Sequence, residues 1–213
     1  MTKARLKEIP TRGVEEGLTE RLVGLGADPL RMATLGPQGT SSERAAYELL
    51  EVCETDAACI GEVSLYPSFE EAARSVMEGE SAAVVVANAY SEVNALYMSP
   101  RFFLAGAFMS VTPDYGLVVS GKAPIPLCVS VATHPAPAAL VGELAPPSLL
   151  VQQTLQASST SEAAKMVADG KVDLALTNET SAREYSLRFI SPKRPIRMLW
   201  SVFVASSKVD TSA

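Results

Sequence analysis

A twelve-residue segment occurs twice in this 213-residue chain, and the repeat constrains the fold more than any other feature. Residues 68–79 read SFEEAARSVMEG and residues 159–170 read STSEAAKMVADG, with six identical positions and no gaps. Each copy opens with the Ser-x-x-Glu pattern of a capped helix start and ends with glycine, the residue preferred just after a helix. A hydrophobic, strand-like run follows each copy, so the sequence predicts two similar α/β lobes; convergence of two ordinary capped helices is the alternative. Two lobes imply a cleft, and small ligands bind in clefts between domains.

The rest of the chain alternates hydrophobic runs with helix-like runs, which predicts the α/β class. Strands are expected at 32–35, 60–66, 82–87, 103–112, 115–119, 125–133, 149–155, 172–177 and 198–205. Helices are expected at 41–53, 69–78, 136–144, 160–169 and 179–185. Residues 1–31 are expected to form an N-terminal arm with a short helix, and residues 206–213 a C-terminal tail.

Composition excludes several classes of function. With 18 basic and 24 acidic residues the net charge is −6, which argues against nucleic acid and against an anionic membrane surface as partner. No run approaches the ~20 apolar residues of a membrane span, and no secretory signal is recognised, so a cytoplasmic location is expected. Three cysteines and one histidine do not provide the spacing of a zinc site, and no metal is expected.

The run GPQGTSSE at 36–43 follows an expected strand and opens an expected helix. Exposed backbone amides at such a helix start favour a carboxylate or phosphate, which makes Thr40, Ser41 and Ser42 candidate substrate contacts. The run lacks the lysine of a phosphate-binding P-loop and the spacing of a dinucleotide site. The alternative is a tight strand-to-helix turn with a purely structural role.

A second hydroxyl-rich helix start supplies Ser158, Ser159 and Thr160, with the same two interpretations. The sole histidine, His134, stands at the end of an expected strand, where it serves either as a ligand contact or as a structural hydrogen-bonding group.

Three further candidates come from strand ends. Asn88 and Tyr90 follow a buried strand, as active-site residues of open α/β sheets often do. Asn178 is either a helix cap or a substrate contact. No Ser-His-Asp or Cys-His set can be assembled from the sequence, so the catalytic residues stay unassigned.

Several motifs resemble the prephenate dehydratase family, in the right order and over about residues 32–205. They are ATLGPQGTSSERAA at 33–46, THP at 133–135, STSEAA at 159–164 and DLALTNETSAREYSL at 173–187. The resemblance implies two α/β lobes of the type II periplasmic-binding-protein kind with the site between them. The first lobe would comprise about 32–98 plus 190–205, and the second about 99–189.

The chain departs from the dehydratase pattern at its most informative positions. The family's Thr-Arg-Phe, whose threonine is implicated in expelling the ring hydroxyl, is absent, and the corresponding stretch reads IRMLWSVF at 196–203. The family's Glu-Asn-Ser is replaced by Ala89-Tyr90-Ser91. These changes resemble the non-aromatising prephenate decarboxylases of the bacilysin type. The matching motifs are GTSSE at 39–43, AY at 89–90, YM at 97–98, YGL at 115–117, HP at 134–135, STS at 159–161, ALTNE at 175–179 and WS at 200–201.

This resemblance implies a carboxy-lyase that removes CO₂ from prephenate, keeps the 4-hydroxyl, and needs no metal or organic cofactor. The product would be a dihydro-4-hydroxyphenylpyruvate used for a non-proteinogenic amino acid or antibiotic. The alternatives are a prephenate dehydratase giving phenylpyruvate and a non-catalytic small-molecule-binding module. Prephenate is the expected partner, and a homodimer is left open.

Overall fold

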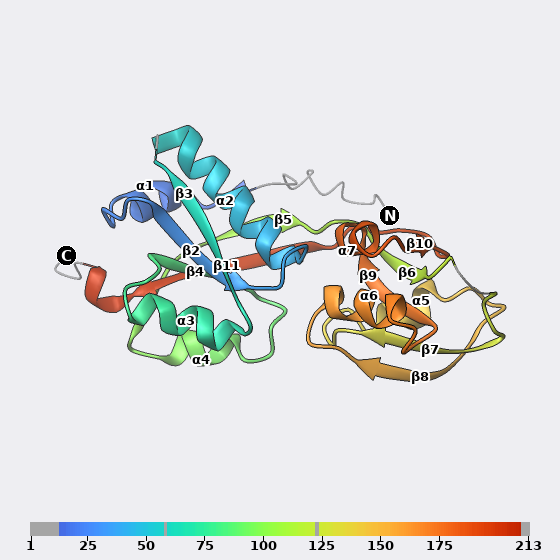
Figure 1. Cartoon of the computed structure of the whole chain (residues 1–213). Helices are drawn as coiled ribbons and strands as arrows, with labels where there is room; N and C mark the ends of the chain where they lie inside the picture. The colour runs from blue at the N-terminus through green and yellow to red at the C-terminus, as the bar shows by residue number, and fades with distance from the viewer. Residues whose placement is uncertain (1–12, 58, 122–123, 210–213) are drawn as a thin grey trace, which may run out of the picture.

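The structure is a computed structural model that describes residues 13–57, 59–121 and 124–209. It forms two α/β lobes, each built on one sheet (Figure 1). The first lobe contains β1 (Gly13–Val14), α1 (Leu18–Val23), β2 (Leu30–Leu35), α2 (Ser41–Ala57), β3 (Gly61–Tyr66), α3 (Phe69–Met77), β4 (Ala83–Ala87), α4 (Val93–Met98), β5 (Phe102–Val111), β11 (Arg197–Ala205) and the 3₁₀ turn η1 (Ser206–Lys208). The second contains β6 (Tyr115–Val119), β7 (Cys128–Thr133), α5 (Leu140–Leu144), β8 (Leu150–Gln156), α6 (Thr160–Ala168), β9 (Leu174–Asn178), α7 (Glu179–Glu184) and β10 (Arg188–Phe189). The predicted two-lobed α/β fold is confirmed.

The first sheet has the order β1-β5-β11-β4-β2-β3, and the second has the order β10-β6-β9-β7-β8. All five residues of β4 are buried, as expected of a strand covered on both faces. Helices α1 and α2 cover one face of the first sheet, and α3 and α4 cover the other (Figure 1).

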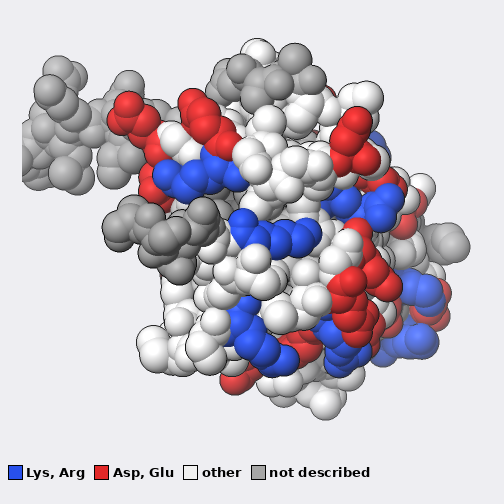
Figure 2. Space-filling model, turned by 90° about the vertical axis from the view of Figure 1, so that its left-hand side faces the viewer, with Lys and Arg blue, Asp and Glu red and all other residues white. Residues whose placement is uncertain are grey.

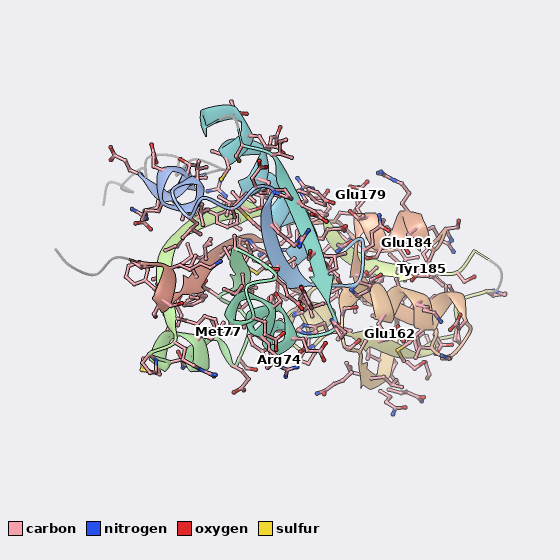
Figure 3. All side chains as sticks on the ribbon, turned by 60° about the vertical axis from the view of Figure 1, so that its left-hand side comes forward. Arg74, Met77, Glu162, Glu179, Glu184 and Tyr185 are labelled. Carbon is pink, nitrogen blue, oxygen red and sulfur yellow. The ribbon has the colours of Figure 1, made fainter. Side chains whose placement is uncertain are left out.

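The sequence repeat forms equivalent elements in the two lobes. Ser68 caps α3 by accepting a hydrogen bond from the Glu71 N–H at 3.2 Å, and Ser159 caps α6 by accepting one from the Glu162 N–H at 3.0 Å. Glycines with positive φ, 78° at Gly79 and 70° at Gly170, follow the two helices. Each helix leads into a buried strand that pairs in parallel with an earlier strand of its lobe, β4 with β2 and β9 with β7. In Figure 3, Glu162 marks the start of α6 beside the first lobe, and Arg74 and Met77 mark the far part of α3.

The expected N-terminal arm differs from the structure in its described part, because residues 13–31 pack into the first lobe. Strand β1 pairs antiparallel with β5, and Leu18 and Leu22 of α1 are fully buried in the core. The Arg21 side chain donates a hydrogen bond to the Ala105 carbonyl at 2.7 Å. The first twelve residues lie outside the described part of the chain.

The lobe boundary also differs from the expected one at residue 99. Strand β5 lies in the first sheet and pairs along its length with β11, so the second lobe begins after Val111. Two chain segments link the lobes, and Thr112 and Ile196 join them: the Thr112 N–H donates to the Ile196 carbonyl at 2.9 Å, and the Ile196 N–H donates to Thr112 Oγ1 at 3.0 Å. A further bridge pairs Tyr115 with Arg194.

Smaller differences have local causes. The expected helix 136–144 begins only at Leu140. Before it the chain forms turns, in which the Ala138 N–H donates to the Pro135 carbonyl at 3.1 Å and the Leu140 N–H to the Pro137 carbonyl at 2.9 Å. The short helix α4 was not expected. Figure 2 shows acidic and basic side chains intermingled on the face it presents, in keeping with a mixed surface charge.

Candidate active site

A cavity of about 320 Å³ lies between the lobes. Its wall contains eight of the residues singled out from the sequence: Thr40, Ser41, Ser42, Tyr90, His134, Ser158, Ser159 and Thr160. The other lining residues are Leu35, Pro67, Ser68, Phe69, Glu70, Ala87, Ala89, Thr112, Tyr115, Ala136, Pro137, Ile196, Met198 and Trp200. Both lobes and both connecting segments therefore contribute to one site.

Three helix starts meet at this cavity. The first residues of α2 and the capped starts of α3 and α6 all line it. Helix N-termini present unpaired N–H groups and a positive partial charge, which favours anionic ligands. None of the described residues lining the cavity is Lys or Arg. An anion bound here would therefore be held by backbone amides and hydroxyl groups.

The hydroxyl groups at these helix starts differ in what they can still bind. The Thr40 hydroxyl donates to the Leu35 carbonyl at 3.1 Å and accepts from the Glu43 N–H at 3.2 Å, so it is engaged in the turn itself. The Ser159 oxygen accepts the cap hydrogen bond, and a hydroxyl that accepts still has its own proton to donate. Ser159 is the better placed of the two to donate to a ligand.

Ser41 connects the lobes across the cavity. Its Oγ lies 3.0 Å from the hydroxyl oxygen of Tyr115, on the first strand of the second lobe. Burial raises the pKa of Tyr115 above its usual value, so this phenol stays protonated. The contact joins residues 74 positions apart.

His134 lies half-buried at the end of β7. Its Nδ1 accepts a hydrogen bond from the Ala136 N–H at 3.2 Å, which leaves the proton of the neutral ring on Nε2. Burial lowers the pKa of His134 below its usual value of 6.5. At neutral pH this residue is a neutral hydrogen-bond donor rather than an acid.

Because His134 is the only histidine in the chain, its titration can be followed directly by NMR. We expect its imidazole Cε1–H resonance to titrate with a midpoint below 6.5, since burial disfavours the charged ring. A depressed pKa contributes stability that is present above pH ~6.5 and is lost as the pH falls through the folded-state pKa. A midpoint above 6.5 would contradict the neutral-donor assignment.

Tyr90 makes a contact in the cavity that the sequence did not suggest. Its phenol donates a hydrogen bond to a carboxylate oxygen of Glu70, in the first turn of α3. Burial, followed by the hydrogen bond to Glu70, raises the pKa of Tyr90, and the same hydrogen bond is the main cause that lowers the pKa of Glu70. The pair thus carries one negative charge on Glu70. The only signal for Glu70 in the sequence was its place at a capped helix start.

Asn88 and Asn178 were expected at the site but are absent from the described lining of the cavity, and their side chains make hydrogen bonds within the protein. Asn178 is fully buried, caps α7 by accepting from the Ser181 N–H at 2.9 Å, and donates to the Gly39 carbonyl at 3.3 Å. Asn88 accepts a hydrogen bond from the Ser201 hydroxyl at 2.8 Å. The Ser201 oxygen also lies 2.5 Å from the Tyr97 hydroxyl oxygen.

Trp200 and Ser201 point to opposite faces of β11, as successive strand residues do. Trp200 lines the cavity and is only 1% exposed, whereas Ser201 is absent from the described lining. The indole N–H of Trp200 is buried and finds no hydrogen-bond acceptor among the described residues. An indole ring therefore forms part of the cavity wall.

Within the described ranges, no group of three His, Cys, Asp or Glu residues is arranged to hold a metal ion. Among the described helices, none combines the length and the apolar character needed to cross a bilayer.

Sequence comparison identifies relatives that cover most of the chain. Prephenate decarboxylase from Bacillus amyloliquefaciens is 33% identical over 180 residues, covering 80% of this chain and 84% of that protein. Prephenate decarboxylase from Planktothrix agardhii is 34% identical over 178 residues, covering 82% and 87%. No protein-family model matches the sequence.

Structure comparison agrees on the fold. Prephenate dehydratase from Arthrobacter aurescens, solved with L-Phe, aligns with a TM-score of 0.60 at 17% identity, over 82% of this chain and 60% of that one. The chain thus spans less than two thirds of the length of that dehydratase. A periplasmic domain of BvgS from Bordetella pertussis aligns with a TM-score of 0.55 at 16% identity, over 92% and 87%. From its sequence relatives, the chain belongs to the prephenate decarboxylase family.

Proposed function

We propose that this protein is a carboxy-lyase that removes CO₂ from prephenate without aromatising the ring. The product would be a dihydro-4-hydroxyphenylpyruvate, used to build a non-proteinogenic amino acid or antibiotic, and the reaction would need no metal or organic cofactor. The observation that carries the proposal is the identity of 33–34% to prephenate decarboxylases over about 80% of the chain.

The cavity is suited to this substrate. Prephenate carries a carboxylate and a pyruvyl arm on one ring carbon and a neutral hydroxyl on the opposite carbon. The starts of α2 and α6 offer N–H and hydroxyl donors for the carboxylate of the pyruvyl arm. Trp200, Phe69 and Met198 offer apolar walls for the ring. Moving a carboxylate from water into such surroundings favours the loss of its charge, which decarboxylation achieves.

Retention of the hydroxyl is consistent with the groups around the cavity. Dehydration needs a proton at the departing oxygen. Ser201, which lies near the place of the dehydratase threonine in sequence, is bound to Asn88 away from the described lining. His134 is held neutral by burial and by the Ala136 N–H. Neither residue is placed to act as the acid that a dehydratase requires.

Incubation of the protein with prephenate at neutral pH tests the proposal. We expect an enzyme-dependent product that is lighter than prephenate by CO₂ alone and lacks the ultraviolet absorption of an aromatic ring. Mass spectrometry and absorption spectra, compared with a blank without enzyme, measure both properties. Phenylpyruvate as the main enzyme-dependent product would restore the dehydratase assignment, and the absence of any turnover would favour a binding module.

A cytoplasmic location is part of the same proposal. The three cysteines, Cys53, Cys59 and Cys128, are free thiols, as is usual for proteins of reducing compartments. The homodimer stays a prediction.

A further inference from the structure

We propose that Glu70 is a specificity-determining residue, whose carboxylate accepts a hydrogen bond from the ring hydroxyl of the substrate and thereby keeps that hydroxyl on the ring. The inference rests on the proposed decarboxylation of prephenate. The side chain of Glu70 would then determine whether the loss of CO₂ yields the non-aromatic keto acid or phenylpyruvate.

Glu70 is an exposed residue whose carboxylate is held by a hydrogen bond from the Tyr90 side chain. It stands in the first turn of α3, directly after the Ser68 cap and Phe69, and lines the cavity. The Tyr90 phenol donates to one of its oxygens, and the Tyr90 ring packs on Phe69 with ring centroids 4.9 Å apart. A carboxylate has about four lone-pair sites, so Glu70 can accept a further hydrogen bond from a ligand.

The charge of Glu70 orients the substrate. It is the only Asp or Glu among the described residues that line the cavity, and the hydrogen bond from Tyr90 keeps its pKa low. The anionic end of prephenate is therefore repelled from Glu70 and attracted to the starts of α2 and α6. The neutral hydroxyl, on the opposite ring carbon, is the group that can face a carboxylate at no electrostatic cost. Tyr90, which stands where dehydratases carry asparagine, supplies the phenol that holds Glu70.

The two outcomes begin with the same bond cleavage and differ in where the released electron pair ends. In both, the bond to the ring carboxylate breaks and CO₂ leaves. In the dehydratase outcome the electron pair expels hydroxide, which needs a proton at oxygen. In the decarboxylase outcome the same electron pair forms a new double bond between the ring carbon that lost CO₂ and its neighbour. The double bond already at that neighbour opens, and the carbon at its other end takes a proton from water. An ionised Glu70 has no proton to give to the departing oxygen. Because it accepts a hydrogen bond from the ring hydroxyl, it leaves more negative charge on that oxygen and makes hydroxide a poorer leaving group.

The test compares the products of Glu70→Gln with those of the unchanged protein, using prephenate at neutral pH. Glutamine keeps the size of the side chain, removes its charge and adds an N–H donor that can bind the hydroxyl oxygen. We expect the ratio of phenylpyruvate to non-aromatic keto acid to rise about tenfold or more above that of the unchanged protein. The ratio is measured by chromatography with mass detection, after subtraction of a blank without enzyme.

Two further variants complete the test. Tyr90→Phe removes the phenol that fixes Glu70 and should shift the ratio in the same direction by a smaller factor. Glu71→Gln, an exposed neighbour absent from the described lining, should leave the ratio unchanged. An unchanged ratio in Glu70→Gln, with CO₂ still released, would overturn the role of Glu70 alone. No CO₂ release by the unchanged protein would instead overturn the proposed function, and the inference with it.

Discussion

Replacement of Leu22 by Ala is expected to lower the free energy of unfolding by about 2–5 kcal/mol. Leu22 lies on α1, has no exposed surface, and belongs to the core of the first lobe. Removing its branched end takes away buried apolar surface and leaves a cavity that the surrounding sheet cannot fully close. The measurement is chemical denaturation followed by fluorescence or circular dichroism.

Val23→Ala is the matched control on the same helix, because Val23 is only half-buried. Its cost should be well below that of Leu22→Ala, since fewer contacts are lost. If both variants unfolded at the denaturant concentration of the unchanged protein, α1 would contribute little to the core, as a helix in a separate N-terminal arm would.

Replacement of Ser159 by Ala is expected to lower kcat/KM for prephenate by roughly 10- to 100-fold, the worth of one hydrogen bond to a charged group. The cost in stability should be only ~1 kcal/mol, the worth of a helix cap. The two effects separate because the Ser159 oxygen accepts from the Glu162 N–H while its own proton is available to the ligand. Steady-state kinetics and thermal unfolding on the same samples measure them.

Ser75→Ala provides a control with a similar structural cost. The buried Ser75 hydroxyl donates to the Ala72 carbonyl at 2.8 Å, and its oxygen lies 3.1 Å from Ser81 Oγ. Ser75 is absent from the described lining of the cavity. This variant should lose stability and keep its kcat/KM. If Ser159→Ala behaved in the same way, with a lower melting temperature and equal catalytic efficiency, Ser159 would be a structural cap only.

The features that the sequence predicted well are those built from neighbouring residues. A serine cap and a closing glycine lie within a dozen positions of each other in the repeat, so α3 and α6 followed from a short pattern. The same is true of the buried strand β4, whose five apolar residues in a row indicate cover on both faces.

The features that the sequence predicted poorly depend on contacts between parts of the chain that are distant in sequence. Helix α1 is short and only weakly amphipathic in sequence, and its place in the core rests on a sheet edge formed by β5, more than 80 residues later. The lobe to which β5 belongs is decided by its pairing with β11, near the end of the described chain. Propensity and periodicity do not show which strands will pair.

The two α/β lobes and the capped helix starts could be predicted from the sequence, because capping and hydrophobic alternation act over a few residues. The folded chain, in contrast, sets how each candidate side chain is used. It engaged the Thr40 hydroxyl within its own turn, tied Ser201 to Asn88, and brought Tyr90 onto Glu70 in the cavity. The physical reason is that a polar group's free donors and acceptors depend on which partners the packed chain places within about 3 Å of it, and those partners come from residues distant in sequence.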